Sequence, residues 1–282
     1  MQSEQAPMSF SPVVGMPTKA IVNGTTFPTS RTMVVSADLG AGTGSTANYF
    51  KGVGFTYNST ETVWKPTSGS YYWPLAGSLE IMAYSGGSLV FSSTPTWTNA
   101  TSVVMTSADY TADDLLVGGL TAATASSKSI AFKHALCKVS CTAKASVANI
   151  IKIKSITINV KKGATITATK TAGNSAVSFS TASLTGAADV SMFSGNQALS
   201  TTAAAAGNAV MFPAQTPASI SVTYTITNNG VESPVMSLTK SLTTAMVSGS
   251  AYTLALNMTL TGLTVTATLT DWSNGGSTAV NI

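Results

Sequence analysis

The sequence predicts an all-β protein built from β-sandwiches, and three observations support this. First, apolar and polar residues alternate with a period of two in many short runs, which is the pattern of a half-buried strand. Second, turn residues recur about every ten residues, as they do in sandwich folds. Third, helical pattern is scarce, since only "SADYTADDLLVGG" and "TTAAAAGNA" favour a helical turn. The chain has 282 residues, 44% of them hydrophobic, enough for one large or two ordinary cores.

The alternation assigns side chains to faces. In "SISVTYTITNNG" one face carries Ile220, Val222, Tyr224 and Ile226. Asn229-Gly230 follows as a hairpin turn, because both residue types tolerate the positive φ that a tight turn needs. "LTVTATLTDW" repeats the alternation with Val265, Ala267 and Leu269. "IIKIKSITINVKKG" slips in phase near Lys154-Ser155, which predicts a β-bulge.

Residues 131–146, "AFKHALCKVSCTAKAS", hold both cysteines and the only histidine. As a strand, the segment places on one face Ala135, Cys137, Val139, Cys141 and Ala143, and on the other Phe132, His134, Leu136 and Lys138. As a helix it would bring His134 and both cysteines together, but a zinc site would lack a fourth ligand. A disulfide is disfavoured because four residues of strand span about 13 Å, whereas bridged Cα atoms lie within about 7 Å. We therefore predict a core strand with two buried free thiols, compatible with synthesis in a reducing compartment.

Charge is sparse and uneven. Charged residues make up 9% of the chain, against about 25% in a typical soluble domain. Nine lysines and no carboxylate lie between Lys128 and Lys170, which could serve an anionic partner. Arg31 is the only arginine, however, and arginine is the usual reader of bases and phosphates. We expect solvated strand faces and no nucleic-acid partner. No stretch approaches the roughly 18 apolar residues of a membrane span, so we expect no membrane insertion.

The sequence offers little for catalysis. One histidine limits acid–base chemistry, and no nucleophile elbow, dinucleotide fingerprint or P-loop is present. Only Asp109, Asp113 and Asp114 cluster, in "SADYTADD". Their oxygens could hold calcium, although the spacing is not that of an EF-hand and acids at the start of a helix would look the same. We expect no enzyme activity and no cofactor.

Aromatic residues gather in "SGSYYWPLAGSLEIMAYS" (68–85). Exposed Tyr71 and Trp73 could stack on a sugar ring or a partner, but Tyr72 and Trp73 closing a sandwich core is the preferred interpretation. A small-residue stretch, "GLTAATASSKS" (119–129), is a candidate linker. We place a domain boundary there, with an N-terminal domain over 1–128 and a C-terminal domain over 129–282.

Four motifs in order, "YYWPLAGSLEIMAYS", "FKHALCKVSCTAK", "MFPAQTPASISVTYTI" and "AYTLALNMTLTGLTVTATLTDWSNGG", resemble the fimbrillin family, the subunits and tip proteins of type V pili. "MSFSPVVGMPTKAIVNGTTFP" is similar to the N-terminal strand region of that family. The resemblance covers most of the chain. It implies two tandem transthyretin-like, Greek-key β-sandwich domains, a structural or adhesive role and no enzyme.

The resemblance also implies a mode of assembly. In polymerising members a cut after a basic residue removes an N-terminal strand, and the open groove takes a strand from the next subunit by β-augmentation. Lys19 stands where an arginine is usual, so Lys19 and Arg31 are the candidate processing residues. The C-terminal "TLTDWSNGGSTAVNI" is the candidate donor strand, with the anchors Leu269, Trp272 and Val280.

The setting of the protein leaves two main hypotheses. "MQSEQAPMSF" has neither the basic nor the apolar region of an export signal, and a lipobox cysteine is absent. We therefore expect a component of a bacteriophage virion exterior, made in the host cytoplasm, that decorates the head, forms a fibre or contacts the host. The alternative is a type V pilus subunit or tip adhesin on the bacterial surface, and a third hypothesis is a secreted carbohydrate-binding module. Expected partners are copies of the chain, neighbouring structural proteins, or a host glycan or protein.

Overall fold

The computed structural model describes residues 5–14, 27–40, 48–126, 128–260, 262–271 and 277–280. Strands dominate these residues, and their one helical element is a short 3-10 turn, η1 (Asn99–Thr101). The all-β prediction is confirmed. No helix in these ranges is long and apolar enough to cross a membrane.

The two candidate helices are absent. Residues 108–115 form a loop in which Asp109 Oδ1 accepts hydrogen bonds from the N–H and hydroxyl of Thr111, at 2.8 and 2.6 Å. Ser107 Oγ accepts the N–H of Asp109 at 3.1 Å. These local side-chain bonds satisfy backbone groups that a helix would otherwise use. The second stretch forms bends and the short strand β13 (Ala204–Ala205).

The chain divides into two compact units, each discontinuous in sequence. Unit 1 comprises residues 1–135 and 164–183, and unit 2 comprises 136–163 and 184–282. The long strands β11 (Ile151–Lys170) and β12 (Val177–Ala198) contribute residues to both units. A single boundary at residue 128 does not describe this division, because the β11–β12 hairpin returns to unit 1 after the chain has entered unit 2.

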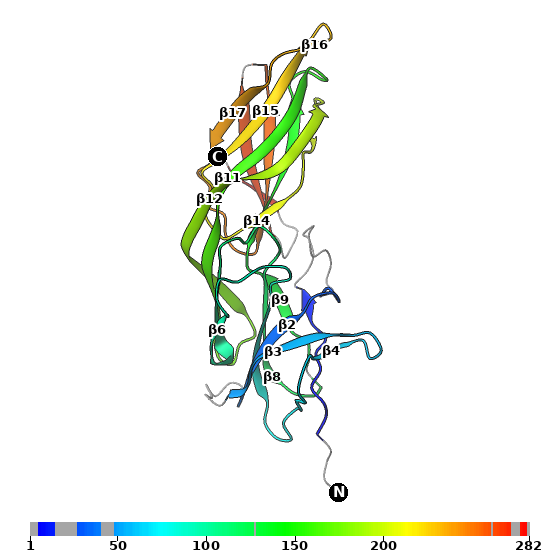
Figure 1. Cartoon of the computed structure of the whole chain (residues 1–282), viewed down its shortest axis with the longest axis vertical. Helices are drawn as coiled ribbons and strands as arrows, with labels where there is room; N and C mark the ends of the chain where they lie inside the picture. The colour runs from blue at the N-terminus through cyan, green and yellow to red at the C-terminus, as the bar shows by residue number, and fades with distance from the viewer. Residues whose placement is uncertain are drawn as a thin grey trace. The chain divides into compact units, whose positions relative to one another are not determined.

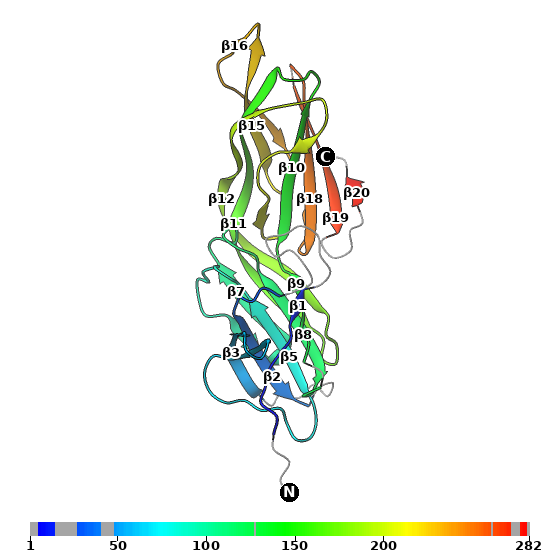
Figure 2. The ribbon, with the colours of Figure 1, turned by 90° about the vertical axis from the view of Figure 1, so that its right-hand side faces the viewer.

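Unit 1 contains a seven-stranded sheet of order β1-β9-β8-β5-β2-β3-β4. The strands are β1 (Val13–Val14), β9 (Ala131–His134), β8 (Leu116–Ala123), β5 (Leu79–Ser85), β2 (Met33–Leu39), β3 (Asn48–Asn58) and β4 (Val63–Pro66). A second group of strands in unit 1 consists of β6 (Thr96–Thr98), β7 (Ser102–Ser107) and the 164–170 part of β11. β12 pairs with β11. Figure 2 shows β1, β9, β8 and β5 in this unit.

β5 is the central strand of unit 1, and all seven of its residues are buried. One face, with Leu79, Ile81 and Ala83, joins a core cluster that also contains Phe10, Phe55 and Trp73. The alternate residues Glu80, Met82 and Tyr84 point to the opposite face because side chains alternate along a strand and they are buried as well. Both faces of β5 are therefore covered by other parts of the unit.

Unit 2 is a β-sandwich (Figures 1 and 2). One sheet has the order β13-β10-β18-β19-β20, with β14 also paired to β10. Its strands are β10 (Cys137–Ala145), β18 (Ser250–Met258), β19 (Leu263–Asp271), β20 (Ser277–Val280) and β14 (Val210–Phe212). The other sheet joins the 151–163 part of β11 to β15 (Ser219–Asn228), β16 (Val231–Glu232) and β17 (Met236–Ser241).

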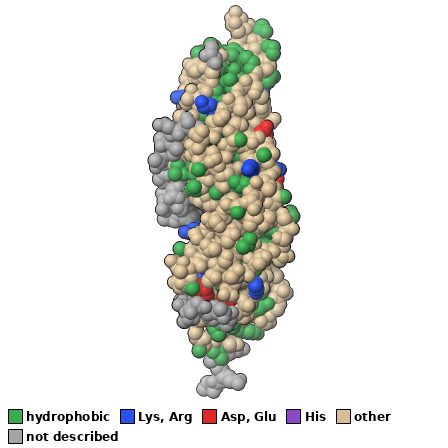
Figure 3. Space-filling model, turned by 90° about the vertical axis from the view of Figure 1, so that its left-hand side faces the viewer, with side chains coloured by type: hydrophobic (Ala, Val, Ile, Leu, Met, Phe, Trp, Pro, Cys, Tyr) green, Lys and Arg blue, Asp and Glu red, His purple; other side chains and the backbone are tan. Residues whose placement is uncertain are grey.

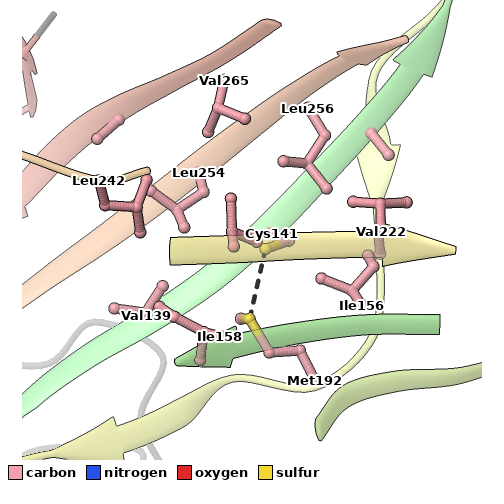
Figure 4. Packing of buried hydrophobic residues seen from close by; sticks show 14 of the residues in the cluster. Val139, Cys141, Ile156, Ile158, Met192, Val222, Leu242, Leu254, Leu256 and Val265 are labelled. Atoms are coloured by element: carbon pink, nitrogen blue, oxygen red, sulfur yellow. Dashed lines mark hydrogen bonds between the residues drawn. The ribbon is translucent and has the colours of Figure 1, made fainter. Parts of the chain in front are cut away.

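The core of unit 2 lies between these sheets (Figure 4). Val139 and Cys141 of β10 meet side chains from the facing sheet, including Ile158 and Val222. The Sγ of Cys141 lies 3.6 Å from the Sδ of Met192. Burial raises the pKa of Cys141 to about 12 and also raises that of Cys137. Both thiols are free and buried, as predicted.

Local predictions for unit 2 are confirmed. Asn229 and Gly230 have φ of 48° and 80° and connect Asn228 to Val231, which pair directly. The β11–β15 register shifts between Ile153 and Ser155, where the bulge was expected. The stretch 131–146, however, is two strands rather than one. β9 ends at His134 in a sheet of unit 1 and β10 begins at Cys137 in a sheet of unit 2.

Candidate assembly site

The N-terminal segment 6–14 lies in unit 1 as an added strand, bonded through its backbone on both sides. On one side, Met8 N donates to Tyr71 O at 2.8 Å, and Phe10 and Trp64 exchange hydrogen bonds of 3.0 and 2.9 Å. On the other side, Val13 N donates to Ile130 O at 2.9 Å, and β1 pairs in parallel with β9. Among the described strands, β9 and β4 lie toward opposite ends of the sheet order, and the segment bonds to both.

Alternate side chains of this segment enter the core. Met8, Phe10 and Val14 are 1%, 0% and 3% exposed. The Phe10 ring meets Phe55 and Trp73 edge-to-face, with centroids 5.0 and 5.6 Å away. Burying each such side chain stabilises the fold by about 1.5–3 kcal/mol. Backbone pairing supplies affinity and the inward side chains set the register, which is the chemistry of strand addition.

The groove contains one polar atom that the N-terminal segment leaves unsatisfied. Trp73 is 3% exposed, and its Nε1 is buried without a hydrogen-bond partner. The ring packs among core side chains and presents no face to solvent, so of the two candidate ligand contacts only Tyr71 is partly exposed. Tyr72, expected in the core, is 41% exposed, and its carbonyl accepts the hydroxyl of Tyr49 at 2.8 Å.

Of the candidate processing residues, Lys19 lies outside the described residues. Arg31 is 8% exposed and lies two residues before β2. Its guanidinium forms an ion pair with Asp113 and donates to Asp114 O at 2.8 Å. Burial opposes ionisation of Asp113, but hydrogen bonds from the N–H groups of Ser88 and Asp114, together with the charge of Arg31, outweigh it and lower the pKa of this carboxyl. The Arg31 side chain, which an arginine-specific protease must bind, is therefore buried and held in an ion pair, although Thr32 is exposed.

The candidate donor anchors lie in the last strands of unit 2. Leu269 is partly buried against the core and pairs with Tyr252 and Thr278. Val280 pairs through its backbone with Ala267, and Trp272 lies outside the described residues. Within the part of the chain that the structure describes, β20 stands last in the sheet order, next to β19.

The three candidate calcium ligands do not converge. Asp109 caps its own loop, Asp113 binds Arg31 and Ser88, and Asp114 lies 2.6 Å from Nδ1 of His134. Across the described ranges, no three His, Cys, Asp or Glu side chains are grouped so that they could hold a metal ion. Sequence reasoning missed the Asp114–His134 pair because these residues lie on separate segments and share no motif.

The chain belongs to the fimbrillin-like family, whose profile matches residues 18–272. This is a family of fimbrial proteins rather than of enzymes, and the family predicted from the four motifs is confirmed. The match supports the pilus alternative and gives no support to the virion hypothesis. No curated protein matches the chain in sequence.

Solved structures share the fold. A proposed cell adhesion protein from Bacteroides uniformis is 16% identical, with a TM-score of 0.56 over 94% of this chain and 98% of that one. Another from Bacteroides ovatus is 13% identical, with a TM-score of 0.54 over 95% of this chain and 98% of that one. At these identities the likeness establishes the architecture.

Proposed function

We propose that this protein is a fimbrial subunit or tip adhesin of a bacterial cell surface, and that it assembles with copies of itself by strand exchange. The observation that carries the proposal is the N-terminal segment 6–14, which lies beside β4 and β9 as an added strand. It pairs through its backbone on both sides and buries Met8, Phe10 and Val14. Family membership and the adhesive assignments of the structural relatives agree with this role.

Loss of segment 6–14 would expose apolar side chains and unpaired backbone groups of the unassembled subunit to water, which costs free energy. Phe55 and Trp73 are 0% and 3% exposed while Phe10 covers them. Without it, an apolar groove and unpaired backbone groups of residues 64, 71 and 130 would face water. Large apolar patches and open strand edges are interaction sites. An incoming strand with alternating apolar residues would cover the apolar groove and pair with the free backbone groups.

The C-terminal segment of a second copy is the proposed occupant. Its strand β20 and the residues around it carry the apolar anchors Leu269, Trp272 and Val280. The cut that frees the groove is proposed at Lys19, because Arg31 is held in an ion pair and buried. A cut after Lys19 also leaves the buried Phe27 on the mature chain.

The test is controlled cleavage. A site for a sequence-specific protease is inserted after Lys19, and the size of the product is followed by light scattering and electron microscopy. We expect the intact chain to stay monomeric and the cut chain to polymerise. Excess synthetic peptide of residues 5–14 should block growth.

A matched control distinguishes the role of the C-terminal segment as donor strand from the role of the groove as its acceptor. The same cut in a chain that lacks residues 272–282 should open the groove without forming polymers, and it should bind a peptide of residues 263–282. If the cut chain releases residues 1–19 and remains monomeric at high concentration, strand exchange by this protein is refuted.

A further inference from the structure

A buried ionic cluster in unit 1 has no part in the proposed assembly. Lys170, Glu80 and Asp38 are 6%, 4% and 2% exposed. Glu80 lies on the face of β5 opposite to Leu79 and Ile81, which contact the core behind the N-terminal strand. A buried ion pair is costly to form and is weak support for stability, so its presence here calls for another explanation.

The amine of Lys170 is held against the Glu80 carboxyl group. Lys170 Nζ contacts Glu80 Oε1 and also donates to Asn174 O at 3.2 Å. The other oxygen, Glu80 Oε2, accepts the N–H of Gly173 at 3.3 Å. The aliphatic stem crosses β8 at Gly119, where a Cβ atom would lie 2.8 Å from Lys170 Cδ. A glycine is thus required for the amine to reach the carboxyl.

A second carboxyl group lies beside the first. Asp38 on β2 is directly opposite Glu80 on β5 in the strand register, so the two side chains share a face. Asp38 Oδ2 accepts the N–H of Ala100 at 2.7 Å. Burial raises the pKa of Asp38, and burial lowers that of Lys170 to about 8. The neutral amine and a protonated acid are both accessible at this site.

We propose that Lys170 and Glu80 condense into an intramolecular isopeptide bond. A proton first passes from Lys170 Nζ to the Glu80 carboxylate within the pair, and the lone pair of the resulting neutral Nζ then attacks Cδ of that carboxyl group to form a C–N bond. One C–O bond then breaks, and that oxygen leaves as water with the carboxyl proton and one amine proton. Asp38 relays a proton from nitrogen to the leaving oxygen and ends unchanged. The reaction needs no oxidant, reductant or co-reactant.

The product fits the site better than the ion pair does. The amide N–H would donate to Asn174 O, and the amide carbonyl would accept the N–H of Gly173, as the precursor groups already do. The two buried charges of the ion pair disappear. The bond would join residues 90 apart in sequence and fasten the end of β11 to β5. Such a link resists extension, which suits a surface fibre.

The test is the intact mass of the purified full-length chain. We expect a mass lower than the sequence mass by one water, and a linked peptide containing both Glu80 and Lys170 after digestion. Lys170→Arg keeps the positive charge but should restore the full mass. Lys152→Arg is the matched control, because Lys152 forms an exposed pair with Glu232 and its loss should leave the mass deficit in place.

Further results would decide the proposal. A wild-type chain that keeps its full mass after prolonged incubation at neutral pH would overturn it. A water loss without the linked peptide would also overturn it, since the loss then lies elsewhere. Asp38→Asn should leave a mixture of linked and unlinked chains whose linked fraction grows slowly. If Lys170→Arg fails to fold, peptide mapping of the wild-type chain still gives the answer.

Discussion

Single side chains in unit 1 are paired across long stretches of sequence. Arg31 meets Asp113, and His134 meets Asp114, so two adjacent acids hold the start of β2 and the end of β9. Removing one partner of a buried pair costs about 3–5 kcal/mol because the other charge stays buried. The loop 108–115 therefore binds the Arg31 guanidinium through Asp113 and the carbonyl of Asp114.

This geometry predicts that Asp113 protects Arg31 from proteolysis. Asp113→Asn should lower the free energy of unfolding by about 3 kcal/mol and speed cleavage of the Arg31–Thr32 bond by an arginine-specific protease. The pKa of Asp113 is lowered below 3.8, so its contribution is present above that pH and is lost as the pH falls further. Acid titration of stability should therefore be flatter in the variant.

The exposed pair of Glu61 and Lys65 supplies the control. Glu61→Gln should change stability by at most about 1 kcal/mol and leave protease resistance intact. Equal cleavage of wild type and Asp113→Asn at Arg31 would show that the ion pair does not protect the bond.

Because the two cysteine thiols are buried, we expect the free energy of unfolding to fall at high pH. Their pKa values are raised above 9.0 by burial, so the folded state holds its thiol protons where the unfolded state releases them. Stability is complete below pH 9 and falls as the pH rises, by up to about 1.4 kcal/mol per pH unit for each thiol. Denaturant titrations at pH 8 to 10.5 should show this fall, and Cys137→Ala with Cys141→Ala should reduce it. Rapid alkylation of the native chain at pH 8 would contradict the buried positions.

Elements were predictable where their signal is local. β15, its Asn229-Gly230 turn and the bulge near Ser155 follow from alternation and turn chemistry within a few residues. The break between β9 and β10 was not predictable, because both strands keep alternation and only their sheet partners differ. The division of β11 and β12 between the two units was not predictable for the same reason, because alternation does not show which sheet a strand joins. The ion pairs were missed because their members are far apart in sequence and belong to no motif.

The face assignment of β10 gives a prediction for this element. Val139 is 0% exposed in the core of unit 2, so Val139→Asp would bury an unpaired charge. We expect a loss of about 3 kcal/mol or more in unfolding free energy, measured by denaturant titration. Lys144→Asp, at an exposed position of the same strand, should cost far less. Similar melting temperatures for both variants would show that the core lies elsewhere.

At the scale of the whole molecule, charge is sparse, since charged residues make up 9% of the chain. On the face in Figure 3, lysines are scattered among small polar and apolar residues. Lys152 and Lys154 pair with Glu232, and Lys170 with Glu80, so part of the lysine-rich segment is neutralised within the fold. In the proposed assembly, the N-terminal strand of the chain occupies the position that a neighbouring strand would enter.

Strand exchange then predicts which residue sets the speed of assembly. After a cut following Lys19, the segment 6–14 remains bound without a covalent link and must leave before a donor strand enters. Phe10→Ala removes packing worth about 3–5 kcal/mol. If those contacts are lost before the rate-limiting step, release should accelerate by about a hundredfold to a few thousandfold, because each 1.4 kcal/mol is a factor of ten. Stopped-flow detection of a labelled segment 1–19 would measure release, and light scattering would measure growth.

Val13→Ala is the matched control, because Val13 is 38% exposed and makes the same backbone bond to Ile130. It should change the release rate by only a small factor. Faster release together with faster growth in Phe10→Ala would mean that departure of the N-terminal strand limits assembly. Faster release with unchanged growth would place the barrier at donor entry instead, and unchanged release would show that Phe10 does not anchor the segment.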